Sequence, residues 1–312
     1  MTVAVVIPCY NVAEHIAQVI RTLPADISYI VTVNDCSVDE TERLLLQLQQ
    51  ENAKIIYLKH ERNQGVGGAM LTGFRKSLEL DAAVTIKLDG DNQMDPSYIP
   101  QLIEPLTENE ADYTKGNRFR DFQALKQMPM IRRIGNLVLG FLIKVASGYW
   151  NIFDPTNGFV AISNAMLRTI DFERIHKRYF FESSMLIELY HANAVVKEIP
   201  MKARYGLETS TLSVTRTVIG FPPRLLFALL RRIVLRYYLV DFNIASVCIL
   251  CGLPLFIFGW LFGLIKFVQY ASSHIRAPTG TVVIPTLLII LGFQLLLSAV
   301  NYDVTNYPKR KE

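Results

Sequence analysis

The segment Asp89-Gly90-Asp91-Asn92-Gln93 places two carboxylates and an amide close together in the chain. Two carboxylates two residues apart, with a glycine between them, can face one hard cation. Oxygen ligands suit Mg²⁺ or Mn²⁺, which in turn bind the oxygens of a diphosphate. Such an ion would offset the negative charge that develops on a departing nucleoside diphosphate. The alternative is an ordinary acidic turn after a strand, because a D-x-D segment alone is common.

A second polar segment runs from Asn34 to Thr41 and contains three side chains of interest. A carboxylate such as Asp35 can accept a hydrogen bond from the imide or ring N–H of a nucleotide base. Ser37 and Asp39 are better explained as caps of a helix that begins near Thr41.

A third segment, Asn63-Gln64-Gly65-Val66-Gly67-Gly68, is glycine-rich and opens a predicted helix. A turn of this kind can approach a phosphate. It lacks the Lys-Ser/Thr pair of a P-loop and does not follow the G-x-G-x-x-G pattern. A tight contact between helix and sheet is the alternative.

Each of these segments lies in an alternating series of buried strands and helices. Because strands and helices alternate at this spacing, the sequence predicts an α/β domain with a largely parallel sheet. Ligands bind at the carboxyl ends of such strands, so Asp35, Asp89 and Asp91 are expected to share one cleft. The predicted strands cover 3–7, 29–33, 54–58 and 83–88, and the predicted helices cover 13–22, 41–50 and 67–80, with a further helix starting at Asp95-Pro96.

The composition shows a surplus of apolar residues in the last third of the chain. The protein of 312 residues is 51% hydrophobic, with a mean hydropathy of +0.24, and most of the surplus follows Phe221. The net charge of +4 is small, and no face is saturated with Lys and Arg, so a nucleic-acid partner is not expected.

Two stretches in this region, Ile244–Ile265 and Thr281–Val300, contain no charged residue. Each is long enough to cross a hydrocarbon core of about 30 Å as a helix. The connection 266–280 is short, so the sequence predicts a transmembrane hairpin. Buried helices in a soluble core are the alternative.

Basic residues set the expected orientation of the hairpin. Seven flank it on the two outer sides and two lie in the connection, which predicts an inner-membrane protein with both ends and the α/β domain in the cytosol. The flanking residues are Arg224, Arg231, Arg232, Arg236, Lys309, Arg310 and Lys311; the two others are Lys266 and Arg276.

The segment 224–240 is predicted to form an amphipathic helix in the membrane interface. Leu226, Phe227 and Tyr237 lie on its apolar side, and the four arginines of the segment would contact lipid headgroups. These arginines are Arg224, Arg231, Arg232 and Arg236. A plain linker helix or a subunit contact is the alternative. The expected domains are a catalytic domain over 1–215, juxtamembrane helices over 216–241, two transmembrane helices over 242–301 and a basic tail over 302–312.

Taken together, the segments from Val3 to about Ser213 resemble the family 2 glycosyltransferases, which have the Rossmann-like GT-A fold. The two-span tail narrows the resemblance to the dolichol- and polyprenyl-phosphate glycosyltransferases, and two later segments look like that group's G-S-R-F and D-x-x-x-G-F. The matching segments, in order, are Ile7-Pro8-Cys9-Tyr10-Asn11, Asn34-Asp35-x-Ser37-x-Asp39-x-Thr41, Asn63-x-Gly65, Asp89-x-Asp91-x-Gln93, Gly116-Asn117-Arg118-Phe119 and Asp154-x-x-Asn157-Gly158-Phe159.

The resemblance implies a role for each matching position. Asp35 would contact the base of a nucleotide sugar, and Asp154 would lie near the transferred sugar. The implied sets are Pro8, Tyr10, Asn11, Asp35, Gly65 and Asp89 for the nucleotide sugar; Asp89, Asp91 and Gln93 for Mg²⁺ or Mn²⁺; Arg118, Arg132 or Arg133, and Arg204 for the acceptor phosphate; and Asp91, Arg118 and Asp154 for catalysis. A homo-oligomer, such as a tetramer, is also expected.

Two positions depart from the family pattern. The family often has two acidic residues at the positions of Asn34 and Asp35. Asparagine at the first of these positions is a common change. The family's R-x-x-G-x-S-K becomes Arg204-Tyr205-Gly206-Leu207-Glu208-Thr209-Ser210-Thr211, without the lysine.

The expected function is inverting transfer of a hexose, from a donor of the UDP-glucose or GDP-mannose type, to a polyprenyl phosphate. A lipid phosphate is already anionic at pH 7 and needs no general base, which fits a sequence without an evident catalytic triad. Two alternatives stay open: a diacylglycerol or ceramide hydroxyl acceptor, which would need a base, and a non-catalytic membrane scaffold.

Overall fold

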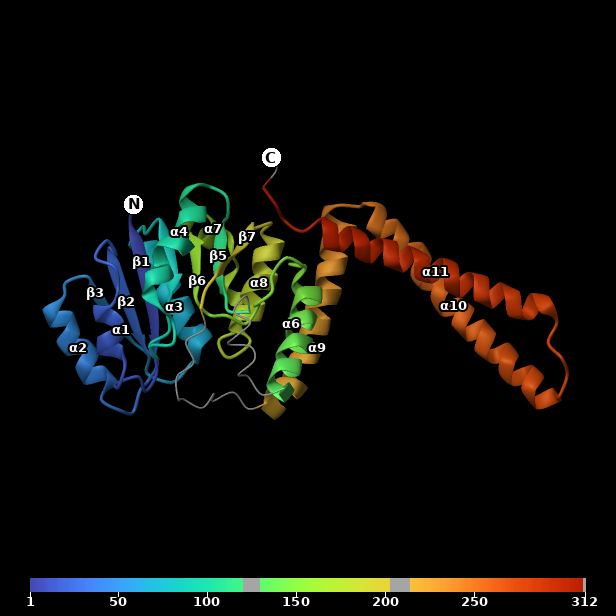
Figure 1. Ribbon diagram of the computed structural model, residues 1–312, viewed down its shortest axis with the longest axis horizontal. Coiled ribbons are helices and arrows are strands. Elements are labelled where there is room, and N and C mark those ends of the chain that lie inside the picture. The colour runs from blue at the N-terminus through green and yellow to red at the C-terminus, as the bar shows by residue number, and fades with distance from the viewer. Residues whose placement is uncertain (120–129, 203–213, 311–312) are drawn as a thin grey trace. The chain divides into compact units, whose positions relative to one another are not determined.

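The computed structural model describes residues 1–119, 130–202 and 214–310. The chain divides into two compact units (Figure 1). One comprises Met1–Ala228 and Pro308–Glu312, and the other Leu229–Tyr307. The predicted boundaries at 215, 241 and 301 remain predictions.

The first half of unit 1 contains every strand and helix predicted for the α/β domain, with ends that differ by a few residues. Asp95 accepts a hydrogen bond from the Ser97 backbone N–H at 3.0 Å, which confirms the predicted cap. The elements are β1 (Val3–Cys9), α1 (Ile16–Arg21), β2 (Tyr29–Asn34), α2 (Thr41–Glu51), β3 (Ile55–Lys59), α3 (Val66–Glu79), β4 (Val84–Lys87), the 3₁₀ turn η1 (Pro96–Tyr98) and α4 (Ile99–Thr107).

The second half of unit 1 completes a seven-stranded sheet in the order β3-β2-β1-β4-β6-β5-β7. Strand β6 runs antiparallel to both neighbours, and the other pairings are parallel. The predicted largely parallel sheet is therefore confirmed. The elements here are β5 (Tyr113–Asn117), α6 (Met130–Ser147), β6 (Val160–Ser163), α7 (Asn164–Thr169), η2 (Phe172–Arg174), α8 (Phe181–His191), β7 (Val196–Pro200) and α9 (Val214–Val234).

Helices cover both faces of the sheet, as the alternating side chains of a strand require. On β1, Val6 belongs to a core with residues of α3, α6, α7 and α8 and with Phe221 and Leu225 of α9. Val5 and Ile7 point to the other face, where α1, α2 and α4 close a second core. Because both faces are buried, the carboxyl edge of the sheet is left for the polar loops.

Unit 2 contains α10 (Ile244–Ser273) and α11 (Thr279–Thr305), which lie side by side as an antiparallel pair (Figure 1). Both helices are long and apolar enough to cross a membrane. They approach closely at two glycines: a Cβ at Gly292 would lie 2.5 Å from the Phe256 backbone N, and a Cβ at Gly252 would lie 3.1 Å from the Gly292 carbonyl O. Small residues allow this contact where lipid supplies no hydrophobic drive between helices.

Arg232, one of the four arginines predicted to face lipid headgroups, is paired within unit 2. Its side chain is buried, and its guanidinium donates to both carboxylate oxygens of Asp303 near the end of α11, at 2.6 and 2.9 Å. Tyr237, expected on the apolar side of the helix, lies in the π-helical turn η3 (Leu235–Val240) and donates its hydroxyl to the same carboxylate. A buried charge needs a partner of opposite sign, and Asp303 supplies it.

Candidate active site

The loops that follow β1 and β2 hold each other at the carboxyl edge of the sheet. The Asn11 backbone N–H donates to Ser37 Oγ at 3.1 Å, and the Val38 N–H donates to Asn11 Oδ1 at 2.9 Å. Asp39 accepts from the Thr41 N–H at 3.1 Å at the start of α2, of which Glu40 is the N-cap residue. Asp39 also accepts from the Ala13 N–H at 3.2 Å, so it joins the two loops as Ser37 does. This edge carries three predicted nucleotide-sugar residues: Pro8, Tyr10 and Asn11.

Asp35 is buried and bonded to the segment that follows β3. Its carboxylate accepts from the backbone N–H of Gln64 at 2.8 Å and of Gly65 at 2.7 Å, and it shares a 2.7 Å hydrogen bond with His60 Nδ1. His60 Nε2 in turn lies 2.9 Å from Thr72 Oγ1. Asp35 therefore fixes the glycine-rich turn, and its contact with a base remains a prediction. His60 is not among the residues expected from the sequence.

The glycines of this turn permit a close approach to the segment 176–178. Gly65 has a φ of +87°, which favours glycine. A Cβ at Gly67 would lie 2.2 Å from the His176 carbonyl O, and the Gly68 N–H donates to the Lys177 carbonyl at 2.9 Å. Tight packing is thus a role of this turn, although against a loop and not against the sheet. Phosphate binding by the turn remains a prediction.

The acidic segment after β4 is joined to a buried lysine that was not expected from the sequence. Lys87 Nζ lies 2.6 Å from Asp89 Oδ1 and 3.6 Å from Glu182 Oε1 at the start of α8. Burial alone would lower the pKa of Lys87, but the charges of Asp89 and Glu182 outweigh burial and raise it. Asp91 Oδ1 accepts from the Gln93 backbone N–H at 3.0 Å, which fixes the turn.

The donor set around Asp89 and Asp91 fits a divalent cation that also binds a diphosphate. Over residues 1–119, 130–202 and 214–310, no three His, Cys, Asp or Glu side chains converge on a complete metal site. Mg²⁺ usually uses one or two carboxylates and completes its shell with phosphate oxygens and water. Two carboxylates are therefore sufficient, and Gln93 remains a predicted additional ligand.

Two further motifs expected from the sequence lie next to each other. Gly116–Phe119 is at the end of β5, and Asp154–Phe159 is in the loop before β6. Gly116 donates its N–H to the Phe159 carbonyl at 2.9 Å, which sets the two segments in register. As a result, Arg118 Nε lies 2.8 Å from Asp154 Oδ2, and its Nη2 lies 3.1 Å from Oδ1. The Asp154 side chain is 0% exposed and that of Arg118 is 37% exposed. The Arg118 side chain is thus partly accessible from solvent.

Two charged residues, the buried Lys115 and the partly buried Glu198, hold the loop that carries Asp154. Neither of them was expected from the sequence. Lys115 Nζ donates to the carbonyls of Asp154 and Asn157 at 2.7 and 2.9 Å. Burial lowers the pKa of Lys115 to about 8 despite the opposing charges of Asp154 and Glu198. Glu198 of β7 accepts from the backbone N–H groups of Phe153 and Asp154, both at 2.7 Å.

Gly158 connects the two groups of charges. A Cβ at this position would lie 2.4 Å from Lys87 Nζ and 3.3 Å from Asp89 Oδ2. The loop 154–158 therefore borders the Asp89 carboxylate at one end and contains Asp154, the partner of Arg118, at the other. Asp35 lies on the same carboxyl edge, directly after β2. A shared cleft of Asp35, Asp89 and Asp91 remains a prediction.

The part of the chain that carries this site matches a known enzyme family. The family model described as Glycosyl transferase family 2 matches residues 4–171, more than half of the chain. The chain belongs to glycosyl transferase family 2. It is therefore a glycosyltransferase, as predicted.

The names of two relatives of this family 2 enzyme state an acceptor. The UDP-N-acetylglucosamine–dolichyl-phosphate N-acetylglucosaminyltransferase of Methanococcus voltae is 32% identical over 69% of this chain and 90% of the relative. The undecaprenyl-phosphate mannosyltransferase of Micrococcus luteus is 27% identical over 64% of this chain and 83% of the relative.

Among solved structures, the glucosyl-3-phosphoglycerate synthase of Mycobacterium tuberculosis, in complex with Mn²⁺, UDP and its product, has a TM-score of 0.54. It is 16% identical and covers 74% of this chain and 79% of its own. At this identity the likeness concerns the fold alone, and with the mostly parallel sheet it confirms the predicted GT-A architecture.

The other arginines predicted for the acceptor phosphate of the family 2 enzyme are Arg132, Arg133 and Arg204. Arg133 is half-buried on α6. The side chain of Arg132 and the whole of Arg204 lie outside the described residues. Their contact with an acceptor phosphate therefore remains a prediction.

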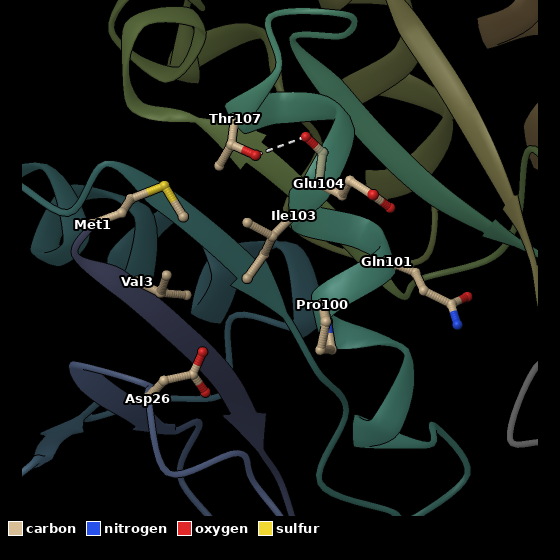
Figure 2. Close-up of a pocket in the computed structure, with 8 residues that line it drawn as sticks. All are labelled: Met1, Val3, Asp26, Pro100, Gln101, Ile103, Glu104 and Thr107. Atoms are coloured by element: carbon tan, nitrogen blue, oxygen red, sulfur yellow. Dashed lines mark hydrogen bonds between the residues drawn. The ribbon is translucent and has the colours of Figure 1, made fainter.

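A cavity of 570 Å³ lies at the opposite end of the sheet from this site (Figure 2). It opens between Met1 and Val3 at the amino end of β1 and the residues Ile103, Glu104 and Thr107 of α4. Because β1 and β4 are parallel, this cavity is separated from Asp89 by the length of the strands. None of the predicted site residues of the family 2 enzyme lines it.

Proposed function

We propose that this enzyme transfers a hexose or N-acetylhexosamine from a nucleotide sugar to a polyprenyl phosphate, with inversion, at the cytosolic face of a membrane. The names of the two relatives and the membrane-length helices α10 and α11 support this acceptor class. The observation that carries the proposal is the loop 154–158. It borders Asp89, a candidate donor-site residue, and it holds Arg118, a candidate acceptor-phosphate residue.

The reaction needs positioning and charge neutralisation more than proton transfer. A phosphate oxygen of the lipid attacks the anomeric carbon, the bond from that carbon to the diphosphate breaks, and the diphosphate leaves with the bonding electron pair. Attack on an α-linked donor gives a β-linked product. Arg118 suits the acceptor because its planar fork matches phosphate oxygens and its side chain is 37% exposed.

Asp89 and Asp91 are the proposed ligands of Mg²⁺ or Mn²⁺. When bound there, the ion supplies positive charge to the leaving diphosphate. Asp91 is fixed by its hydrogen bond from the Gln93 backbone, and Asp89 by its pair with Lys87. Fixed charges need no reorganisation when the leaving group develops its negative charge.

The environment of Asp154 favours a phosphate acceptor over a hydroxyl acceptor. Burial raises the pKa of this carboxyl, but Arg118 and Lys115 more than compensate, so the pKa lies below its usual value. A carboxylate with a lowered pKa is a weak proton acceptor, whereas a diacylglycerol or ceramide hydroxyl would need a base. Asp154 is better suited to orient Arg118.

An exposed apolar face on α6 is consistent with a lipid acceptor. Ile134, Leu137, Val138 and Phe141 follow one side of the helix at spacings of three and four residues, and each is more than half exposed. A helix with such a face can lie in a membrane interface. Phe153, next to Asp154 in the chain, is also exposed.

The test is transfer by the purified full-length enzyme in detergent with Mn²⁺ and polyprenyl phosphate. A panel of UDP-glucose, UDP-N-acetylglucosamine and GDP-mannose is supplied, and mass spectrometry of the lipid fraction identifies the product. We expect one main donor, no product with excess chelator and no product from Asp91→Ala. Equal product from polyprenol or diacylglycerol would contradict the phosphate acceptor, and product in excess chelator would contradict the metal.

A further inference from the structure

Lys87 is a buried cation directly behind the candidate metal ligands. It is the last residue of β4, its side chain is 1% exposed, and its ammonium lies 2.6 Å from Asp89 Oδ1. The motif resemblance gives no role to this position. A buried ammonium is costly unless it is paired, so Asp89 and Glu182 account for its stability here. Its ion pairs with Asp89 and Glu182 do not by themselves explain why a lysine is buried at this position.

The ammonium lies against the loop 154–158 at the carboxyl edge of the sheet. Gly158 covers it so closely that a Cβ would come within 2.4 Å of Nζ. The same Cβ would be 3.3 Å from Asp89 Oδ2, the carboxylate oxygen that does not face Lys87. Lys87 thus holds one oxygen of Asp89 and leaves the other on the side of the loop 154–158.

Without Lys87, the charged groups described around this point would all be negative. Asp89, Asp91 and Glu182 bring three carboxylates, and Lys87 reduces their formal net charge to −2. A divalent cation would balance this value, and a nucleoside diphosphate would then add further negative charge. A fixed positive charge nearby lowers the cost of that addition, because Coulomb energies are large where water is excluded.

We propose that Lys87 is a positioning residue of the donor site, which orients Asp89 and supplies a permanent positive charge for the nucleoside diphosphate. This inference rests on the proposed function. It makes a prediction that a purely structural lysine would not make. Loss of the charge should tighten the binding of a divalent cation alone and weaken the binding of a nucleoside diphosphate.

The test compares Lys87→Met, which keeps the length of the side chain without its charge, with Glu182→Gln, which removes one negative charge from the same cluster. Mn²⁺ binding to the full-length protein without nucleotide is measured by electron paramagnetic resonance. UDP and GDP binding at saturating Mn²⁺ is measured by calorimetry. Lys76→Met, at a partly exposed pair with Glu79 on α3, serves as the matched control and should change neither affinity.

For Lys87→Met we expect Mn²⁺ alone to bind about three- to tenfold more tightly and the nucleoside diphosphate to bind about tenfold or more weakly. Glu182→Gln should shift the Mn²⁺ affinity in the opposite direction. Because that variant keeps the Lys87–Asp89 pair, it remains informative if Lys87→Met does not fold. Equal weakening of both ligands in both variants, or no change in either, would overturn the inference. Absence of nucleotide binding in the wild type would instead contradict the proposed function.

Discussion

Arg118 and Asp154 form a two-point ion pair in which one partner is buried and the other reaches solvent. Arg118 Nε and Nη2 donate to the two carboxylate oxygens at 2.8 and 3.1 Å, and the Arg118 backbone N–H adds a third bond at 3.2 Å. The arginine neutralises a buried carboxylate. Under the proposed function it would also contact the acceptor phosphate.

The first prediction concerns stability at acid pH. The pKa of Asp154 is lowered in the folded state, so its contribution to stability is present above the unfolded value of 3.8 and is lost as the pH falls below it. In Arg118→Ala burial remains while the main compensating charge is gone, so the pKa of Asp154 should rise. The destabilisation caused by the variant should therefore be largest near pH 7 and should shrink as the pH falls and Asp154 is protonated. At pH 7 the variant should lose about 2–3 kcal/mol, less than a fully buried pair would, because Arg118 is partly exposed.

The measurement is the thermal midpoint of the detergent-solubilised protein between pH 3 and pH 7. Arg118→Lys keeps the charge without the fork and should fall between the wild type and Arg118→Ala. An Arg118→Ala midpoint that follows the wild type at every pH would show that the pair does not stabilise the fold.

The second prediction separates acceptor binding from donor binding. Removal of a charge-assisted contact of roughly 1.5–3 kcal/mol in Arg118→Ala should lower transfer efficiency about ten- to a hundredfold. Nucleotide affinity should barely change, while Asp91→Ala should weaken it. Calorimetry with UDP and GDP and transfer rates against polyprenyl-phosphate concentration provide the two readouts. An unchanged lipid dependence in Arg118→Ala would refute the acceptor role of this residue.

The third prediction concerns Glu198, whose carboxylate accepts hydrogen bonds from the loop that carries Asp154. Glu198→Ala would remove the acceptor of two backbone N–H groups, that of Phe153, which is exposed, and that of Asp154, which is part-buried, at a cost of about 1 kcal/mol for each bond. Transfer should fall at least about tenfold with a smaller effect on nucleotide affinity. In Glu198→Gln the amide oxygen can still accept both bonds, so this variant should recover part of the rate. Equal rates for the two variants would exclude a positioning role.

The fourth prediction tests the packing of the glycine-rich turn. A methyl group in Gly67→Ala would meet the His176 carbonyl at 2.2 Å, and the variant should lose about 2–3 kcal/mol. A Cβ at Gly135 on α6 would meet nothing within 4 Å among the described residues beyond its own helix turn, so Gly135→Ala should be neutral or up to about 1 kcal/mol stabilising. Thermal midpoints of the two variants give the comparison. A Gly67→Ala midpoint equal to that of Gly135→Ala would mean that the loop 176–178 can move away without cost.

The fifth prediction concerns membrane topology. The excess of basic residues outside the hairpin places Ser272 on the outer side and Lys309 in the cytosol. In a background with Cys36 and Cys251 changed to serine, Ser272→Cys should react with an impermeant maleimide in intact cells. Lys309→Cys should react after the membrane is opened. Labelling in the reverse order would invert the proposed orientation.

The sequence predicted the elements up to β4 because each is a short apolar run or an amphipathic helix between clear turn signals. It missed β5, since Lys115, Gly116 and Asn117 are polar residues typical of a loop. Their burial is caused by long-range pairing with β6 and β7. Local pattern contains no information about such partners.

The same reason explains which site residues were found. Asp89 and Asp91 are recognisable by their spacing, and Arg118 and Asp154 by the motifs of a known family. Lys87 and Glu198 are single charged residues in strands, a type that usually faces solvent. Glu198 becomes part of the site through a hydrogen bond to a residue 44 positions away, a relationship that requires the fold.

The ion pair between Arg232 and Asp303 also has a consequence for how the protein is made. The two residues are 71 positions apart, so at about 5–20 residues per second the ribosome needs roughly 4–14 s to supply the second after the first. During this interval Arg232 has no Asp303 with which to pair. A carboxylate at the end of an apolar helix is costly near hydrocarbon until it is neutralised. The final turn of α11 can therefore take up its paired arrangement only after synthesis has passed residue 303.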